Sequence, residues 1–285
     1  LKPFGGADEI GPDSDAAIFA SLLDGDGDPQ LTLAIPARGL TKKAMKETAK
    51  AVKALKADLV VVEGSSELTR KDSAALAETL DARAVVVARH QHGMAAADLV
   101  ARTEPYADRL TELVINCRGA YLATEANKLA SDLESAGTPV LAVIPEDRRL
   151  LGVTVRRLAE HLGGRFVDGA TGADALVEHF LVGGWMLDEG TIYFGTRSDK
   201  AVIIRGDRPD LAMSALATPT RVLVLTKGVE PIEYVTYEAG EEGTALVIVE
   251  QDTLATMDAL ETVIESARFD HPDKLARMAE LFEDH

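Results

Sequence analysis

Two short runs of apolar residues, 201–204 and 222–225, each stop abruptly at a polar turn. The first turn supplies carboxylate and guanidinium groups, and the second supplies a hydroxyl group, an ammonium group and a glycine. The residues are Asp207, Arg208 and Asp210 in the first turn and Thr226, Lys227 and Gly228 in the second. Cationic side chains bind phosphate oxygens, and glycine allows the backbone to approach a ligand closely. The two turns therefore predict a binding site for a small anionic molecule.

The elements around these turns explain why the turns would meet. Both apolar runs are rich in β-branched residues and uninterrupted, which is typical of buried parallel strands. Residues that follow such strands lie at the carboxyl edge of the sheet, where open α/β sheets bind ligands. A helix is expected to begin near Pro209, with acidic residues in its first turn. A purely structural alternative stays open, in which Asp207 caps this helix and Arg208 pairs with a carboxylate.

Length and composition limit the protein class. A chain of 285 residues with 46% apolar content suits two ordinary domains, and 5% aromatic content predicts aliphatic cores. The formal charge of −17 argues against nucleic acid as a partner. Cys117 is the only cysteine, so an intrachain disulfide is excluded and a reducing cytoplasm is expected. No apolar run approaches the roughly 20 residues of a membrane span.

The first half of the chain alternates strands and helices. Strands are expected at 58–63, 84–89, 113–117 and 140–145, and helices at 41–56, 95–106 and 124–135. This alternation predicts a three-layer α/β domain with a mainly parallel sheet. Glu63 would end a buried strand, where an acid can hold a magnesium-bound water, or it would cap a turn. His90 and His92 could begin a metal site, but no third ligand lies near them in sequence.

Beyond a joint near 145–149, the expected elements are a helix at 154–162 capped by Thr154, a short strand at 165–167 and a helix at 174–181 that carries His179. Helices are also expected at 257–266 and 273–282. The last one is amphipathic, so it would dock on its own domain or on a partner chain.

The second half resembles the DRTGG domain, which is named for an Asp-Arg after one strand and a Thr-Gly-Gly after the next. Here these are Asp207-Arg208 and Thr226-Lys227-Gly228, and the likeness extends over residues 148–270. The resemblance implies a DRTGG-like domain at 148–285 and adds Asp252 and Thr253 to the expected ligand site. Lys227 stands where the family has its first glycine, so it would be strained if this turn needs a positive φ.

The first half resembles the dethiobiotin synthetase-like domain that precedes a DRTGG domain in long phosphotransacetylases. The matching residues are Lys2-Pro3, Asp13 and Asp15, Val62-Glu63-Gly64, Val114-Ile115-Asn116 and Val143-Ile144-Pro145-Glu146. The resemblance implies a P-loop NTPase-like domain at 1–147. In it Lys2 and Glu63 would face phosphates and metal, while Asn116 and Pro145 would face the base. The family's G-x-x-x-x-G-K-[ST] loop is missing, and we expect residues before Leu1 that could hold it.

Together these observations predict two three-layer α/β domains and a regulatory protein that binds a nucleotide or phosphometabolite. ATP or another adenine nucleotide is the expected ligand, with Mg²⁺ if a P-loop precedes Leu1. A homo-oligomer and a metabolic enzyme are the expected partners. Two alternatives stay open: an ATP-dependent cyclo-ligase of the dethiobiotin synthetase type, and an oligomeric scaffold that binds no nucleotide.

Overall fold

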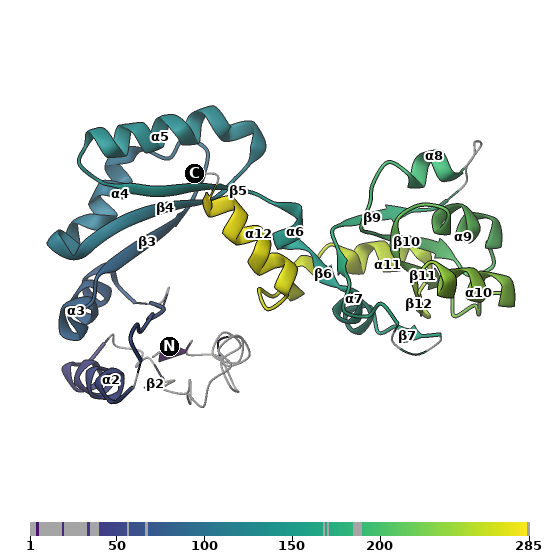
Figure 1. The fold of residues 1–285 in the computed structure, drawn as a ribbon, viewed down its shortest axis with the longest axis horizontal. Helices are drawn as coiled ribbons and strands as arrows, with labels where there is room; N and C mark the ends of the chain where they lie inside the picture. The colour runs from purple at the N-terminus through teal and green to yellow at the C-terminus, as the bar shows by residue number, and fades with distance from the viewer. Residues whose placement is uncertain are drawn as a thin grey trace. The chain divides into compact units, whose positions relative to one another are not determined.

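The computed structural model describes residues 40–283 except 56, 66, 67, 168, 170 and 185–189, together with residues 4–5, 19 and 33–34. The chain divides into two compact units (Figure 1). The first consists of Leu1–Glu146 and Met278–His285, and the second of Asp147–Arg277. Lys2, Asp13, Asp15 and Trp185 lie outside the described residues.

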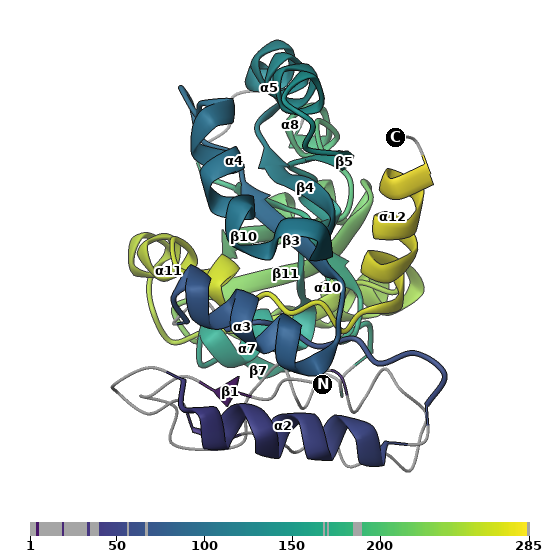
Figure 2. The same ribbon diagram turned by 90° about the vertical axis from the view of Figure 1, so that its left-hand side faces the viewer.

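The first unit is built on a parallel three-stranded sheet in the order β3-β4-β5. Its strands are β3 (Ala84–Arg89), β4 (Leu110–Arg118) and β5 (Val140–Pro145). Helices α4 (Ala96–Thr103) and α5 (Ala123–Ser135) cover one face, where Leu99 and Leu133 join Leu113 and Ile115 in a buried cluster (Figures 1 and 2). On the other face, Val85 and Val87 are exposed. These two helices therefore form a second layer on one side of the sheet.

A helical pair precedes this sheet. It consists of α2 (Lys42–Ala54) and α3 (Arg70–Leu80), with the hydroxyls of Thr41 and Thr69 as N-caps. Buried Leu68 and Leu76 pack against Ala44 and Met45 between the two helices. Short elements complete the described part of this unit. They are β1 (Phe4–Gly5), β2 (Leu33–Ala34), η1 (Glu104–Arg109) and η2 (Ala120–Leu122).

The prediction of a strand at 58–63 is wrong. The structure assigns no strand to residues 57–65, and Leu59 and Val61 are 78% and 71% exposed. An apolar run is stabilised as a strand only when a neighbour supplies ladder hydrogen bonds and covers its side chains. Among the described strands, β3 pairs with β4 alone, so Glu63 does not end a buried strand here.

The second unit contains a five-stranded sheet in the order β7-β12-β11-β10-β9. Its strands are β7 (Arg165–Phe166), β9 (His179–Val182), β10 (Lys200–Arg205), β11 (Thr220–Thr226) and β12 (Ala245–Ile248). All neighbours are parallel except β7, which runs antiparallel to β12. The strands expected at 201–204 and 222–225 are confirmed, and their residues are at most 1% exposed.

Alternation along these strands explains the three layers of the second unit. Ala201, Ile203 and Val224 point to one buried cluster, and Val202 and Ile204 point to another. The elements on the first face are α7 (Val155–His161), α11 (Thr253–Leu260) and η3 (Val263–Ser266). Those on the second are α8 (Gly190–Phe194), α9 (Pro209–Leu216) and α10 (Glu233–Glu241). The predicted α/β class with mainly parallel sheets is confirmed.

The prediction of a helix at 174–181 is wrong. This segment forms β8 (Leu176–Val177) and β9, and His179 lies on β9 in register with Lys200 of β10. Tertiary pairing with β10 overrides the local helical pattern. The predicted cap at Thr154 is confirmed, since its hydroxyl accepts a hydrogen bond from the amide of Arg157.

Three further elements complete the described chain. They are α6 (Arg148–Leu151), β6 (Val153–Thr154), which pairs antiparallel with β8, and α12 (Pro272–Glu283). The amphipathic helix expected at 273–282 is therefore confirmed. None of the helices in the described part of the chain is long and apolar enough to cross a membrane.

Candidate ligand site at the carboxyl edge of the second sheet

The two predicted turns lie next to each other. Strands β10 and β11 are parallel neighbours, so the turns after them share one edge of the sheet. The amide of Gly206 donates to the carbonyl of Thr226 at 3.4 Å, and any side chain at Gly206 would collide with the carbonyl oxygen of Val229. Glycine is therefore required where the two turns touch. This contact brings Asp207 and Lys227 together at the surface.

Each cation of the first turn is already paired. Arg205 donates to both carboxylate oxygens of Asp207, and Arg208 donates to both oxygens of Asp210, at 2.8 and 2.6 Å. The hydrogen bond from Arg205 holds the pKa of Asp207 below its usual value, and the charge of Lys227 adds to this effect. The hydrogen bond from Arg208 likewise lowers the pKa of Asp210.

These contacts decide between the structural alternatives for this turn. The N-cap residue of α9 is Arg208, and no side chain caps this helix, so Asp207 is not its cap. The alternative pairing of Arg208 with a carboxylate is present, and its partner is Asp210. The turn therefore holds two bidentate ion pairs at the surface, where solvent screens the attraction between the charges.

The second turn has its backbone fully engaged. Lys227 and Gly228 both have positive φ, 69° and 63°. The amide of Lys227 donates to the carbonyl of Gln251 at 2.8 Å, and the amide of Gly228 donates to the carbonyl of Val249 at 2.9 Å. These two amides are thus unavailable to a phosphate, and the exposed lysine side chain is what this turn offers a ligand. Lys227 occupies a conformation that favours glycine, which is the strain expected for a positive φ at this position.

A third segment reaches the same edge from β12. The hydroxyls of Thr226 and Thr253 lie 3.0 Å apart, and Thr226 is fully buried. Asp252 is the N-cap of α11, since its carboxylate accepts from the amide of Ala255 at 2.9 Å. The carboxylate of Glu250 lies over Gly228, where an added Cβ would come within 2.6 Å of it. The predicted residues of the second half therefore meet at one edge, with a structural role for Asp252.

Sequence reasoning missed four charged residues at or beside this edge: Arg165, Arg205, Glu230 and Glu250. Arg165 is paired in register with Ile248 at the end of β12 and forms an ion pair with Glu230. Arg205 and Glu250 directly follow buried strand residues, which is the same signal that pointed to Asp207. With them, the described residues of the edge include four cations and five carboxylates. Three of these cations are arginines in ion pairs, so an anionic ligand must exchange with a carboxylate.

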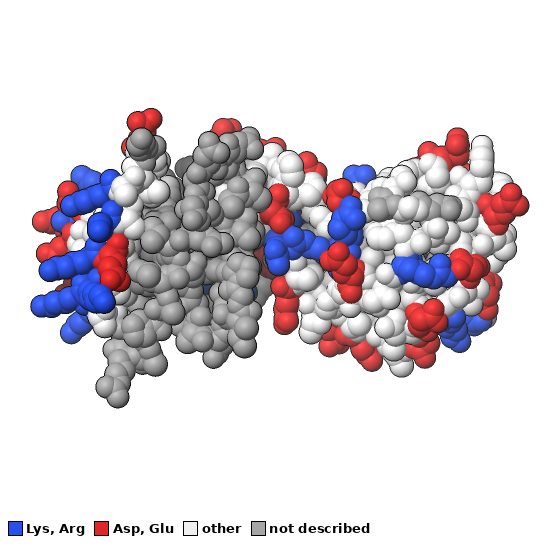
Figure 3. Space-filling model, turned by 90° about the horizontal axis from the view of Figure 1, so that it is seen from below, with Lys and Arg blue, Asp and Glu red and all other residues white. Residues whose placement is uncertain are grey.

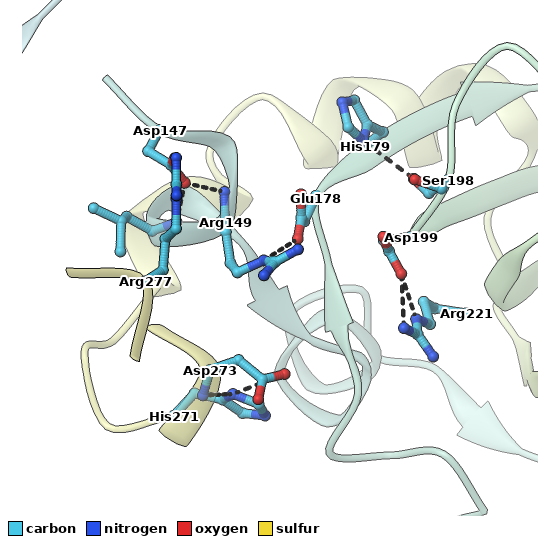
Figure 4. Close-up of polar contacts among 11 residues, drawn as sticks. Asp147, Arg149, Glu178, His179, Ser198, Asp199, Arg221, His271, Asp273 and Arg277 are labelled. Carbon is cyan, nitrogen blue, oxygen red and sulfur yellow. Dashed lines mark hydrogen bonds and ion pairs between the residues drawn. The ribbon is translucent and has the colours of Figure 1, made fainter. Parts of the chain in front are cut away.

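A second set of ion pairs lies away from this edge, and Figure 4 shows it. Arg149 pairs with Glu178 and Arg221 pairs with Asp199, near the amino ends of β9 and β10. Burial alone raises the pKa of Asp147, but hydrogen bonds from Arg277 and from the amides of α6 outweigh it and leave the pKa lowered. These pairs tie α6, α12 and the strand starts together, so they are structural contacts.

The predicted residues of the first unit are spread more widely. Asn116 and Pro145 lie near the carboxyl ends of the neighbouring strands β4 and β5. In the strand register, Asn116 lies opposite Arg89 of β3, and Pro145 lies opposite Arg118 of β4. Glu63 lies in the segment that forms no strand.

A contact that the sequence did not reveal holds the loop after β3. The carboxylate of Glu125 lies 2.9 Å from Nδ1 of His92 and accepts from the amide of Gly93 at 2.6 Å. The hydrogen bond from the amide of Gly93 makes the largest contribution to a lowered pKa of Glu125, and the contact with His92 lowers this pKa further. Glu125 comes from α5, so only the tertiary fold brings it to His92. Within the described residues, no three His, Cys, Asp or Glu side chains form a group that could hold a metal.

Comparison with known proteins supports the assignment of the second unit. The DRTGG domain family matches residues 157–263. The chain is also similar to the CBS and DRTGG domains of the regulatory region of Clostridium perfringens pyrophosphatase, a structure complexed with the activator diadenosine tetraphosphate. That similarity has 10% identity and a TM-score of 0.35, over 66% of this chain and 75% of the other. The match to the DRTGG domain family covers residues 157–263, and this range holds every residue of the carboxyl-edge site described above.

Proposed function

We propose that this protein is a regulatory protein that binds an adenine nucleotide or another phosphate-bearing metabolite at the carboxyl edge of its DRTGG domain. The observation that carries the proposal is the meeting of the Asp207-Arg208 turn and the Lys227-Gly228 turn on parallel strands. Three strands deliver charged and hydroxyl side chains to this edge, as ligand sites of open α/β sheets require.

The chemistry of the edge fits a ligand that has both phosphate and hydroxyl groups. Arg208 forms a bidentate pair with Asp210, and a phosphate offers the same geometry to a guanidinium. When Arg208 turns to phosphate, the carboxylate of Asp210 is released and can accept hydrogen bonds from ribose hydroxyls. Exposed Lys227 adds a second phosphate contact without the loss of an ion pair to a carboxylate of the described residues. The site thus exchanges internal ion pairs for ligand contacts.

We further propose that the first unit is dethiobiotin synthetase-like, as in the N-terminal region of long phosphotransacetylases. The parallel order β3-β4-β5, with Asn116 and Pro145 at the strand ends, supports this relation. In that family's arrangement Asn116 and Pro145 would face the base, and Lys2 and Glu63 would face phosphates and metal. Asp13 and Asp15 would belong to the same ligand site. The regulatory state of the DRTGG domain would then pass to a metabolic enzyme, or between copies of the chain.

Titration calorimetry with ATP, ADP and AMP tests the proposal. Arg208→Ala should weaken binding roughly tenfold, because a hydrogen bond to a charged group contributes about 1.5 kcal/mol or more. Arg221→Ala is the matched control, since Arg221 is also a surface arginine paired with an aspartate, but at the amino end of β11. Unchanged binding by Arg208→Ala refutes the site, and absence of binding by the parent protein favours the scaffold alternative.

A further inference from the structure

Helix α2 carries a lysine stripe, defined as Lys42, Lys43, Lys46, Lys50 and Lys53. All five side chains are exposed. At 3.6 residues per turn they fall within an arc of about 100° on the helix surface. Figure 3 shows blue side chains gathered over α2, at the left of the view. The helix contains a single acid, Glu47, which lies 3.8 Å from Lys43.

The lysine stripe lies on the face of α2 that points away from α3, so it does not contribute to the packing of these two helices. The opposite face packs on α3 through Ala44 and Met45, and Thr48 is buried. Lysines spaced three and four residues apart repel one another, and each such pair costs about 0.2–0.5 kcal/mol. An arrangement that destabilises the isolated helix is stabilised when an acidic surface covers it.

Helix α10 of the DRTGG domain presents a surface of the opposite charge. Its inner face places Val235 and Ala239 in the core. Its outer face, here called the Glu-Tyr face, consists of Glu233, Tyr234, Tyr237 and Glu241. The two tyrosines are 60% and 63% exposed, and neighbouring Ile232 is 53% exposed. Exposed aromatic residues among charged residues are typical of a protein interface.

We infer that the lysine stripe of one copy docks on the Glu-Tyr face of a second copy. The carboxylates of Glu233 and Glu241 would pair with lysine ammonium groups, and the tyrosine rings would receive lysine stems and cation–π contacts. Helices of 13 and 9 residues span about 20 and 13 Å, so the lysine stripe is long enough to cover the whole Glu-Tyr face. In a two-fold dimer the contact is made twice, once in each direction.

Local complementarity, and not net charge, favours a second copy as the occupant. At a net charge of −17, long-range repulsion opposes nucleic acid and a second copy alike, but only the second copy offers carboxylates together with exposed tyrosine rings over the length of one helix. Screening at 1 M salt reduces the Debye length to about 3 Å, so dimerisation should weaken strongly between 0.1 M and 1 M salt. This inference does not depend on the proposed ligand site.

Sedimentation equilibrium of the full chain tests the contact. Lys46→Glu with Lys50→Glu should weaken dimerisation roughly tenfold or more, because attractive contacts become repulsive. Lys71→Glu with Lys128→Glu is the control, since it changes the net charge equally at exposed lysines outside the stripe. Circular dichroism checks that both variants are folded. A monomeric parent chain, or an equal effect of the control, overturns the inference.

Charge exchange between chains provides the second arm. Glu233→Lys with Glu241→Lys should also dissociate the dimer, and an equimolar mixture with Lys46→Glu and Lys50→Glu should restore a heterodimer. Restoration in the mixture requires contact between chains, so it separates a second copy from docking within one chain. No restoration, or binding of a single-stranded oligonucleotide that Lys46→Glu with Lys50→Glu abolishes, overturns the inference.

Discussion

The hydroxyl oxygens of Thr226 and Thr253 lie 3.0 Å apart and join the end of β11 to the first turn of α11. Thr226 is fully buried, and Thr253 is half-buried. The hydrogen bond therefore links a rigid strand to a helix that begins at the edge where the ligand site lies. The start of α11 is held at this edge both by this bond and by the Asp252 cap.

Replacement of Thr226 by valine should lower the free energy of unfolding by about 1 kcal/mol. Valine keeps the shape of threonine but removes the hydroxyl partner of Thr253. Urea denaturation measures the change. Thr262→Val is the control, because that hydroxyl is at a more exposed position and its contacts are 3.4 Å long. A loss no greater than that of the control would show that the bond contributes nothing to stability.

Replacement of Lys227 by glycine should stabilise the protein and weaken its ligand binding at the same time. A non-glycine residue with φ of 69° carries about 1 kcal/mol of strain, which glycine relieves. Removal of the exposed ammonium group removes a phosphate contact of the proposed site. Urea denaturation and calorimetry read the two effects separately.

Lys227→Ala is the informative companion. Alanine removes the charge but keeps the strain, so it should weaken binding without the gain in stability. If alanine stabilises the protein as much as glycine, backbone strain is not the cause.

Two substitutions of Asp252 distinguish its role as a helix cap from a role in ligand binding. Asp252→Ala removes the acceptor for the amide of Ala255 and should cost about 1 kcal/mol of stability. Asp252→Asn keeps a capping oxygen and should leave stability nearly unchanged. Equal denaturation midpoints for the alanine and asparagine variants would contradict the cap. Tight nucleotide binding by the asparagine variant would show that the charge of Asp252 is not needed by the ligand.

The sheet of the DRTGG domain could be predicted from the sequence because its signals are local. Residues 201–204 and 222–225 are uninterrupted apolar runs followed by polar turns, a pattern that strongly favours buried parallel strands. The cap at Thr154 is equally local. Residues 174–181 fit a helix as well as a strand because short apolar runs match either period, and only pairing with β10 decides between them. Residues 58–63 carry the same strand pattern without a described neighbour to complete it.

The residue types of the site could be predicted from the sequence, but the hydrogen bonds and ion pairs that these residues already form could not. Which strands are neighbours follows from the family resemblance and the α/β pattern. That the amides of Lys227 and Gly228 are taken by the backbone after β12 depends on a contact distant in sequence. The pairing of Arg208 with Asp210, although local, competes with several other carboxylates at the same edge. Spacing alone therefore left the structural alternative open.

Two fully buried lysines should make the free energy of unfolding change with pH in the alkaline range. Lys200 donates to the hydroxyl of Thr218 at 3.0 Å and to the carbonyl of Pro219, and Lys274 donates to the carbonyl of Arg268 at 2.8 Å. Burial lowers the pKa of each to about 8 from the ordinary 10.5. Between these values the unfolded chain binds more protons than the folded chain, so the free energy of unfolding should rise as pH increases.

Urea denaturation at pH 7.5, 9 and 10 measures this rise. Lys200→Met removes one of the two titrating groups while it keeps an unbranched side chain, so it should roughly halve the slope of stability against pH. Lys128→Met is the control, because Lys128 is exposed on α5 and should leave the slope unchanged. A parent protein whose stability is flat or falling from pH 8 to 10 would contradict the assignment of these lysines as buried, proton-releasing groups.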